Sequence, residues 1–394
     1  RTPIGSFGGA LSAVRTDDLA AMVIRQLVER NTNVPVESID DVILGCANQA
    51  GEDNRNVARM ALLLAGLPFT VPGETVNRLC ASGMSAVIHA SRAIKSGDGE
   101  IFIAGGVENM TRGPWVISKS SKPFGNDAEM YDSSFGWRFV NPKMKALYGV
   151  DAMGVTAENL VELYNISRHD QDQFALWSQQ KAAAAQAGKR LEQEIFAVEI
   201  PQRKGELLVV GKDEFIKPAT TMEGLAKLKP AFKKDQGTVT AGNSSGLNDG
   251  AAAILVASGE AVKKHNLVPK AKIISSAVIG VEPRIMGIGP VKASQDALAK
   301  AGIALKDVDV IELNEAFAAQ ALVCTRLLGL ADDDSRLNIN GGAIALGHPL
   351  GMSGARIIYS AALELQIQQK RYALVTMCIG VGQGYAVVLE NAAS

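Results

Sequence analysis

Two short stretches of this chain recur at the same offset, so the sequence carries an internal repeat. The triplet Asp-Val-Ile at residues 41–43 returns at residues 309–311, and the triplet Gly-Met-Ser at residues 83–85 returns at residues 351–353. Two matches in one register indicate a duplicated structural unit. We therefore predict that the chain folds into two related halves.

Short apolar runs rich in β-branched residues alternate with longer segments of helical spacing, which is typical of α/β layers around a mostly parallel sheet. The predicted strands cover residues 41–45, 101–106, 308–313 and 372–377. The predicted helices cover residues 16–30, 84–95, 291–301 and 353–365. The fold class is therefore α/β.

Residues 117–239 interrupt this layered pattern, because they contain scattered Pro, Gly, Lys and Met and one good helix, at 168–188. We interpret them as an inserted loop or cap domain. The predicted first half is then residues 1–116, completed by about 240–262, and the predicted second half is residues 263–394. A chain of 394 residues is long enough for several domains.

The composition argues against several classes of protein. The net charge is −1 and charges of both signs are mixed along the chain, which does not suit a nucleic-acid binder. No apolar run has the length and low charge of a membrane span. The four cysteines lie far apart without a CxxC pair, which favours reduced thiols, and the last residues do not form a peroxisomal tripeptide. We expect a cytoplasmic protein that acts on small molecules.

The offset of the repeat also places Cys80 opposite His348, each just before a predicted helix. The positive end of a helix favours a thiolate, so we predict a lowered pKa and a nucleophilic role for Cys80; the alternative is an inert, packed thiol. His348 lies among the glycines of residues 341–351 and is the best candidate for a base. Its alternative is a loop histidine bonded to a carbonyl.

Two further positions have both a chemical and a structural interpretation. Cys378 directly follows a predicted strand, and the glycines of residues 380–384 expose N–H groups that could bind an oxyanion, although a glycine-rich turn between strands is the plain alternative. Asn314 follows a strand and precedes a predicted helix, where an N-cap is the plain alternative. We assign Cys46 and Cys324 to packing.

Five motifs occur in one order, at residues 77–83, 241–250, 314–317, 341–351 and 378–384. In this order and in their residues they resemble the motifs of the thiolases, and the similarity runs from Arg1 to Glu390. The resemblance implies two duplicated αβαβα halves with an inserted loop domain. It also implies an acetyl-CoA C-acyltransferase that cleaves a 3-ketoacyl-CoA with coenzyme A.

The resemblance implies a role for each reactive residue. Cys80 would be the acylated nucleophile, His348 would activate it, and Cys378 would move the proton on and off the acetyl-CoA methyl carbon. One oxyanion site would be His348 with a water held by Asn314. The other would be the backbone N–H groups of Cys80 and Gly380.

Coenzyme A would be a co-substrate, with no permanently bound cofactor and no metal. By resemblance Ser245 would lie near its pantetheine and Lys217 beside its adenine, where many relatives have an arginine. Ala152 and Val381 depart from the biosynthetic members, which often have histidine and glycine there. Dimers or tetramers of identical chains are the expected assembly.

Residues 51–59, 136–142 and 281–284 look most like the thiolases that cleave 3-oxoadipyl-CoA in the breakdown of aromatic compounds. That substrate ends in a carboxylate, which a bidentate arginine would suit, so we consider Arg138 or Arg284 as its reader. A structural ion pair is the alternative for both.

Three alternative functions are considered. A decarboxylating condensing enzyme of fatty-acid synthesis would share the fold, but Cys378 does not match its usual Cys-His-His or Cys-His-Asn set. A general 3-ketoacyl-CoA or acetoacetyl-CoA thiolase, acting in fatty-acid oxidation or in biosynthetic condensation, is the nearest alternative. A non-catalytic module that binds coenzyme A or lipid would not need two thiols and a histidine in glycine-rich loops.

Overall fold

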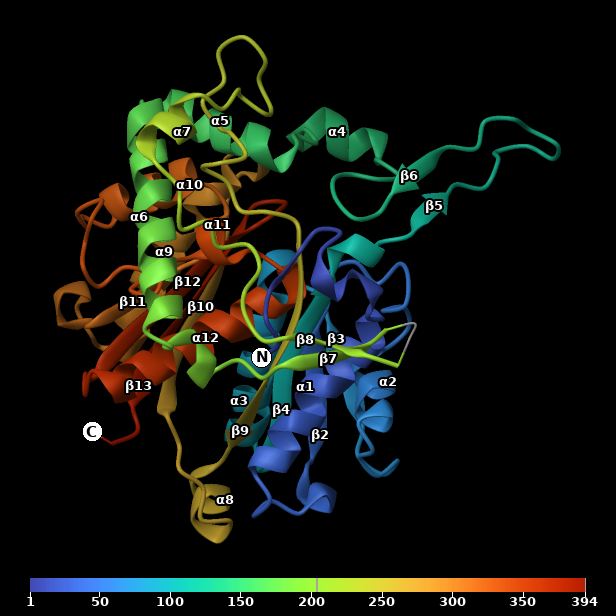
Figure 1. Ribbon diagram of the computed structural model, residues 1–394, viewed down its shortest axis with the longest axis vertical. Coiled ribbons are helices and arrows are strands. Elements are labelled where there is room, and N and C mark those ends of the chain that lie inside the picture. Colours follow the sequence, from blue (N-terminus) through green and yellow to red (C-terminus); the bar gives the residue numbers. More distant parts are fainter. Residues whose placement is uncertain (203–204, 394) are drawn as a thin grey trace.

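A computed structural model describes residues 1–202 and 205–393 (Figure 1). The strands are β1 (Gly5–Ser6), β2 (Asp41–Gly45), β3 (Gly73–Val76), β4 (Ile101–Asn109), β5 (Trp115–Ile117), β6 (Met130–Asp132), β7 (Val198–Pro201), β8 (Leu207–Val210), β9 (Asn248–Ala257), β10 (Ala271–Gly280), β11 (Val310–Leu313), β12 (Tyr372–Ile379) and β13 (Gln383–Asn391). The helices are α1 (Thr16–Arg30), α2 (Val57–Leu64), α3 (Ser82–Ser96), α4 (Pro142–Tyr148), α5 (Met153–Tyr164), α6 (Arg168–Ala187), α7 (Met222–Ala226), α8 (Gly259–Lys264), α9 (Gly289–Ala301), α10 (Ala318–Leu327), α11 (Ala343–Leu346) and α12 (Leu350–Ile367).

The two main sheets repeat one topology. The first has the order β1-β9-β4-β2-β3 and the second the order β10-β13-β12-β11. In each, a central strand pairs in parallel with one neighbour and antiparallel with the other: β4 with β2 and β9, and β12 with β11 and β13. The matching topology confirms the duplication predicted from the repeat.

Both sheets are mixed, so the prediction of mostly parallel sheets was wrong. In the second sheet only β11 and β12 run parallel, while β13 pairs antiparallel with both β12 and β10. The cause is local in this half, because a turn of three residues joins β12 directly to β13 and a connection so short forces an antiparallel pair. In the first sheet β9 occupies the position that corresponds to β13, antiparallel to β4, but a long segment of the chain separates β4 from β9.

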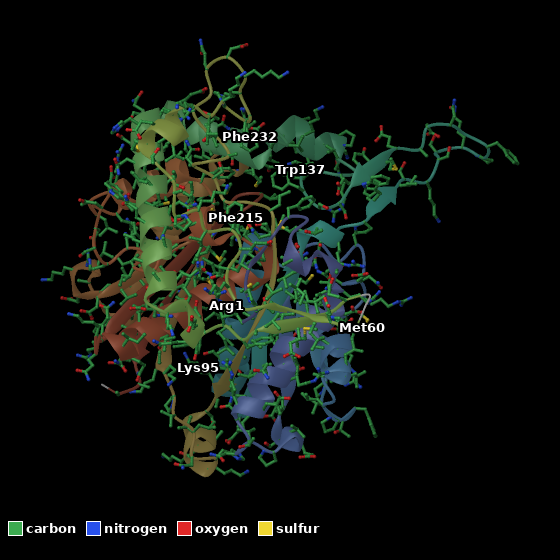
Figure 2. All side chains as sticks on the ribbon, viewed as in Figure 1. Arg1, Met60, Lys95, Trp137, Phe215 and Phe232 are labelled. Carbon is green, nitrogen blue, oxygen red and sulfur yellow. The ribbon has the colours of Figure 1, made fainter. Side chains whose placement is uncertain are left out.

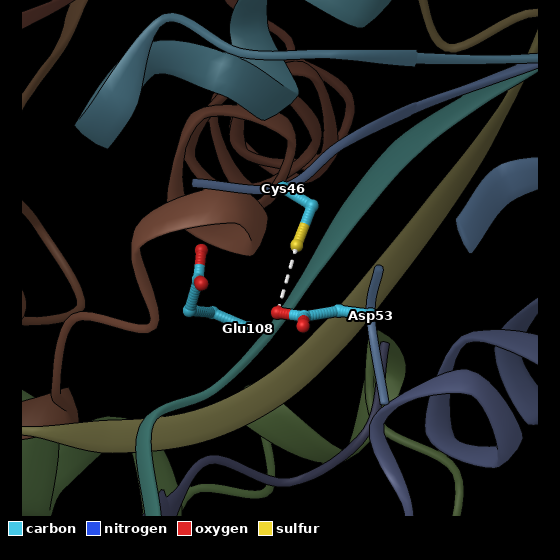
Figure 3. A group of neighbouring side chains, drawn as sticks. All are labelled: Cys46, Asp53 and Glu108. Carbon is cyan, nitrogen blue, oxygen red and sulfur yellow. Dashed lines mark hydrogen bonds between the residues drawn. The ribbon is translucent and has the colours of Figure 1, made fainter. Parts of the chain in front are cut away.

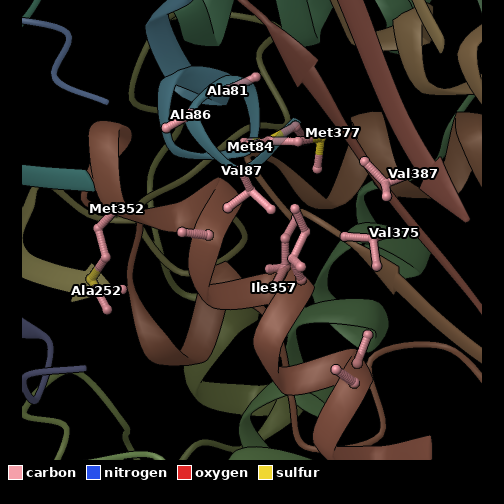
Figure 4. Close-up of a cluster of buried hydrophobic side chains, with 14 of the residues drawn as sticks. Ala81, Met84, Ala86, Val87, Ala252, Met352, Ile357, Val375, Met377 and Val387 are labelled. Carbon is pink, nitrogen blue, oxygen red and sulfur yellow. The ribbon is translucent and has the colours of Figure 1, made fainter. Parts of the chain in front are cut away.

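The apolar faces of the helices and sheets pack against one another in five layers. Helices α3 and α12 lie between the two sheets and share a core with them, part of which Figure 4 shows around Met84, Val87 and Ile357. Helices α1 and α2 cover the outer face of the first sheet, and α9 and α10 cover that of the second. The order is αβαβα, and both halves contribute to it, since each supplies one sheet, one outer layer and one central helix.

The chain between β4 and β9 leaves these layers. It forms a β5–β6 arm that projects from the body in Figure 1, then α4 to α7 and the β7–β8 hairpin. The packing of this segment is divided, because α6 contacts α10 and α11 of the second half, whereas Val198 and Ile200 join the outer core of the first. The described part of the chain contains no helix that is long and apolar enough to span a membrane.

Candidate active site

Helices α3 and α12 meet at their first turns through glycines. A Cβ on Gly83 would lie 2.5 Å from the carbonyl oxygen of Gly351, and one on Gly354 would lie 2.4 Å from the amide nitrogen of Met84. Real Cβ atoms are not found so close to backbone atoms, so these positions require glycine. The loops before the two helices, which carry Cys80 and His348, are thereby brought to one place.

Cys80 lies in a single 3-10 turn, Leu79–Ala81, directly before α3, and its side chain is half-buried. Leu79 has a φ of 46°, a left-handed conformation that is costly for a leucine and fixes the direction of the turn. The side chain of Asn77 supports this turn by accepting a hydrogen bond of 2.9 Å from the Leu79 N–H.

The pKa of the Cys80 thiol does not follow the sequence prediction. Burial raises it above its ordinary value, whereas the backbone N–H groups of Gly380 and of Cys80 itself act in the lowering direction without overcoming burial. The prediction of a lowered pKa was wrong, because the helix start could be inferred from the sequence but the apolar surroundings could not. The free enzyme therefore holds a thiol at this position.

His348 is buried, and its hydrogen bonds define its tautomer. Nδ1 lies 2.6 Å from Ser353 Oγ, and that hydroxyl donates to the carbonyl of Pro349 at 2.9 Å. Because the single hydroxyl proton is used there, we assign the ring proton to Nδ1, which leaves a lone pair on Nε2. Burial, aided by the Arg356 charge, lowers the pKa of His348 to about 3, so the ring is neutral.

Asn314 lies at the end of β11, not at a helix start. Helix α10 begins four residues later, at Ala318, so the N-cap alternative was wrong. The Asn314 Nδ2 lies 3.4 Å from His348 Nε2, and its buried Oδ1 has no hydrogen-bond partner among the described residues. Buried polar atoms normally have a hydrogen-bond partner, so we expect a ligand or a water molecule to bind this oxygen.

Cys378 lies within β12, opposite Gly384 of β13, so its predicted position after the strand was wrong by two residues. It is buried among apolar side chains, which include Ala316 and Phe317. Burial raises the pKa of this thiol well above its ordinary value, and the neighbouring sulfur of Cys80 adds to the effect. Strand β12 also packs against the 3-10 turn that carries Cys80, so the two thiols belong to neighbouring segments, and Cys378 stays protonated.

Gly380 follows β12 in the tight turn that leads to β13, so the plain alternative of a glycine-rich turn describes the backbone well. The pair Ile379 and Gln383 closes this turn, in which Val381 has a φ of 63°. The turn also packs against the loop of Cys80, because a Cβ on Gly380 would lie 3.4 Å from Leu79 Cδ1, and the Gly380 N–H acts to lower the pKa of the Cys80 thiol. A structural turn is therefore compatible with an N–H that is free to bind an anion.

The two residues expected near coenzyme A lie in loops. Ser245 is half-buried, and its N–H and hydroxyl both donate to the carbonyl of Ala316, which anchors it beside the end of β11. Lys217 is exposed, and its Nζ lies 4.9 Å from the ring centroid of Phe215, a residue labelled in Figure 2. Neither contact involves an acidic partner.

The two candidate arginines differ in their partners. Arg284 forms an ion pair of 2.9 Å with Asp151, and its side chain is 54% exposed. Arg138 is half-buried and donates to uncharged oxygens, at 2.9 Å to Asn48 Oδ1 and at 3.4 Å to the Ser133 carbonyl. Within the described residues no carboxylate pairs with Arg138, so its charge is available for a ligand.

A buried carboxylate missed by the sequence analysis links the two halves. Figure 3 shows Glu108 beside Cys46 and Asp53. Glu108 accepts backbone N–H bonds from Ala47, Asn48 and Gly351, the last in the first turn of α12. Asp53 is likewise occupied by N–H donors and by the Cys46 thiol. Because these oxygens are already satisfied, the cluster is explained as a structural brace.

Ser353 is another residue that the sequence analysis did not assign. It is the serine of the second Gly-Met-Ser triplet, so the repeat itself contained the signal. Asn248, which accepts the His348 N–H at 3.0 Å, had no comparable signal beyond its place in a glycine-rich motif.

Comparisons with known proteins agree with this geometry. Residues 1–260 match the model of the thiolase N-terminal domain, and residues 267–391 match that of the thiolase C-terminal domain. The chain is 58% identical over 391 residues to a beta-ketoadipyl-CoA thiolase of Acinetobacter baylyi, covering 99% of this chain and 97% of that protein. It is equally similar, with the same coverage, to the 3-oxoadipyl-CoA/3-oxo-5,6-dehydrosuberyl-CoA thiolase of Escherichia coli.

A solved structure extends the agreement to the fold. The acetyl-CoA acetyltransferase of Bacillus anthracis superimposes with a TM-score of 0.91 at 40% sequence identity, covering 99% of this chain and 96% of that chain. The protein is thus an acyltransferase enzyme built on a duplicated α/β fold. The chain belongs to the thiolase family. The fold and the family inferred from the sequence motifs are therefore confirmed.

Proposed function

We propose that the enzyme cleaves 3-oxoadipyl-CoA with coenzyme A into succinyl-CoA and acetyl-CoA, through an acyl group carried on Cys80. The observation that carries the mechanism is that the turn of Cys80 packs against β12, which carries Cys378, and against Gly380, whose Cβ would lie 3.4 Å from Leu79 Cδ1. The choice of substrate is supported by the names of relatives that are 58% identical over nearly the whole chain.

The first step uses the lone pair on His348 Nε2. The Cys80 thiol passes its proton to this nitrogen as its sulfur bonds to the C3 carbonyl carbon of the substrate. The negative charge that forms on the carbonyl oxygen is received by the backbone N–H groups of Cys80 and Gly380. The neutral state of His348 before this step follows from its low pKa, and the new anion beside it favours its protonated form.

The second step breaks the C2–C3 bond and leaves an acyl group on Cys80. The departing acetyl-CoA enolate places its negative oxygen near protonated His348 and the Asn314 amide, where the unpartnered Oδ1 suits a bridging water. The Cys378 thiol then gives its proton to C2. Its raised pKa keeps this thiol in the form that can donate.

The last step releases the second product. The thiol of coenzyme A gives its proton to the Cys378 thiolate and attacks the acyl carbon on Cys80. As the tetrahedral intermediate collapses, Cys80 leaves and recovers its proton from His348, so every group returns to its initial state. Ser245 and Lys217 would hold coenzyme A, which is a co-substrate, and the mechanism uses no permanently bound cofactor and no metal.

The terminal carboxylate of the substrate would be read by Arg138. Among the described residues its guanidinium binds only uncharged oxygens, whereas Arg284 is already paired with Asp151. A partly buried, unpaired guanidinium can accept a bidentate carboxylate without breaking an ion pair.

The first experiment compares steady-state cleavage of 3-oxoadipyl-CoA and acetoacetyl-CoA by the wild type and Cys80→Ala, with mass spectrometry of the quenched enzyme. A succinyl adduct on Cys80 and a higher kcat/KM for 3-oxoadipyl-CoA are expected. A preference for acetoacetyl-CoA would favour the second candidate, a general thiolase. Turnover without any adduct on Cys80 would contradict the covalent mechanism.

Arg138→Gln tests the choice of substrate more directly. We expect kcat/KM for 3-oxoadipyl-CoA to fall about 10- to 100-fold, the loss of a charged hydrogen bond, while acetoacetyl-CoA cleavage changes little. Arg284→Gln is the matched control and should spare both substrates. Equal losses on both substrates in Arg138→Gln would show a structural role instead.

We also propose that the protein works in the cytoplasm as a dimer or tetramer of identical chains. Strand β3 is an edge of the first sheet, and edge strands offer unpaired backbone groups to a partner. The β5–β6 arm exposes large apolar side chains, among them Trp115, Ile117, Phe124 and Met130. Light scattering of the purified enzyme tests this, and a monomer at micromolar concentration would contradict it.

A further inference from the structure

Arg78, two residues before Cys80, connects the loop that carries Cys80 to the turn that carries Gly380. Its NH1 group donates to Gln383 Oε1 at 2.9 Å, and its Nε donates to Ser85 Oγ at 2.9 Å in the second turn of α3. Its guanidinium carbon also lies 5.7 Å from the ring centroid of Tyr385, which is buried in β13. One side chain of the first half thus contacts two residues of the second.

Gln383 is the first residue of β13, directly after the turn that contains Gly380. It pairs with Ile379 across the β12–β13 ladder and so closes the turn that contains Gly380. Across the site, a Cβ on Gly380 would lie 3.4 Å from Leu79 Cδ1, so the two loops are in van der Waals range. The contact between Arg78 and Gln383 therefore spans the two loops that hold the Cys80 sulfur and the Gly380 N–H.

The partners of Arg78 indicate that geometry is its function. All three are uncharged: a hydroxyl, an amide oxygen and an aromatic ring. No ion pair involves Arg78 among the described residues. A planar guanidinium can bond to two acceptors in fixed directions while its face rests on a ring, which a lysine cannot do. The side chain is thus suited to hold two segments in one relative position.

We propose that Arg78 and Gln383 form a clamp that sets the distance between the Cys80 sulfur and the Gly380 N–H. Arg78 is a positioning residue, since it acts through the two loops and not on the substrate. The inference rests on the proposed roles of Cys80 and Gly380. A loosened clamp would leave substrate binding intact but misplace the N–H that receives the anionic oxygen, which lowers kcat more than it raises KM.

The test is a double-mutant cycle on acetoacetyl-CoA cleavage with Arg78→Met, Gln383→Leu and the double variant. We expect each single change to lower kcat about 10- to 100-fold with KM within about twofold of the wild type, since misplacing a reacting group costs this much. The double variant should be no slower than the slower single variant, because either change alone opens the clamp. Losses that multiply in the double variant would overturn the proposal.

Conservative variants and a control separate positioning from general damage. Arg78→Lys keeps the charge but not the fork, so it should be nearly as slow as Arg78→Met, whereas Gln383→Glu keeps an acceptor and should lose far less than Gln383→Leu. Arg371→Met removes an arginine that lies 4.6 Å from the Tyr372 ring centroid at the other end of β12, and it should leave kcat unchanged. Full activity in Arg78→Lys would overturn the clamp.

Two measurements distinguish a loss of positioning from a loss of folded enzyme. The melting temperature and the circular dichroism spectrum report folded enzyme, and kcat is normalised to the folded fraction. If Arg78→Met does not fold, the pair Gln383→Leu and Gln383→Glu decides alone, and equal kcat values in those two would overturn the proposal. A wild type that turns over without an adduct on Cys80 would contradict the proposed function itself, which is a different result.

Discussion

The starts of α3 and α12 occupy equivalent places in the two halves but carry different chemistry. Before α3 stands Cys80, half-buried, and neither α3 nor α12 has an acidic residue in its own first turn. Before α12 stands His348, fully buried, and Glu108 from the other half accepts an N–H bond from the first turn of that helix. The backbone is repeated, and the charge at the helix end is not.

This difference shows how one duplicated scaffold can hold both an anion and a base. The positive end of α3 stays available for negative charge that develops at Cys80. The positive end of α12 already contacts Glu108, and the ring of His348 is fixed by Ser353 and kept neutral by burial. In the first half the equivalent serine, Ser85, holds Arg78 instead. Four predictions test this division of roles.

The largest effect should come from removing the thiol before α3. Cys80→Ala should lower kcat by at least about 10⁴-fold, as expected for loss of a covalent nucleophile. Cys324→Ala is the matched control, because that thiol lies on the buried face of α10 and its loss should leave turnover near wild type. Residual kcat above a thousandth of the wild-type rate, which is far more than loss of a nucleophile allows, would contradict the assignment.

The next effect concerns the residue before α12. His348→Asn should lower kcat about 10²- to 10⁴-fold, the range for a lost general base. His89→Asn, on the equivalent helix, is the control. Because burial lowers the folded pKa of His348 to about 3, its protonation should cause no loss of kcat/KM between about pH 5.5 and 7.5, although a free histidine titrates there. A pH profile with a histidine limb in this window would contradict the buried neutral ring.

A smaller effect is expected at Asn314, whose amide lies beside the His348 ring. Asn314→Ala should lower kcat about 10²-fold, as loss of one oxyanion partner does. Its Oδ1 has no partner among the described residues, so truncating the side chain to the methyl group of alanine should leave the melting temperature unchanged or raise it. Activity lost together with a large drop in melting temperature would indicate a structural asparagine.

The smallest effect is expected at Glu108, and it is a matter of stability. Burial raises the folded pKa of Glu108 from 4.5 to about 7, so its contribution to stability is full below pH 4.5 and is lost as the pH rises through 7. The free energy of unfolding of the wild type, relative to Glu108→Gln, should therefore fall between these values, by at most about 1.4 kcal/mol per pH unit. Urea unfolding at both ends of the window measures it. A constant difference would contradict the raised pKa.

The sequence was sufficient for the parts of the fold that depend on local pattern. Helix α1 and strand β2 begin and end at the predicted residues, because apolar spacing and flanking residues define both. The direction of β13 could not be predicted, because it depends on how few residues separate it from β12. The end of β12 was placed two residues early, which moved Cys378 out of its strand.

The members of the candidate site could be proposed from the sequence, but their electrostatics could not. Cys80, His348, Cys378 and Asn314 could be selected from motifs, since glycines and a repeat surround them. The raised pKa of Cys80 could not, because it reflects side chains brought in from distant parts of the chain. Arg284 looked as suitable as Arg138 until the structure placed Asp151, 133 residues away in sequence, beside it. Long-range partners of this kind leave no local signal.

The glycine contact between α3 and α12 has a consequence for how this enzyme could change over evolutionary time. The two helices touch through backbone atoms, with Gly83 against Gly351 and Gly354 against Met84. A larger residue at Gly83 or Gly354 would push the first turns of the two helices apart, so this close approach depends on keeping the glycines. New acyl chains could be accommodated by mutating the segment between β4 and β9, while the separation of the two reactive loops is inherited unchanged.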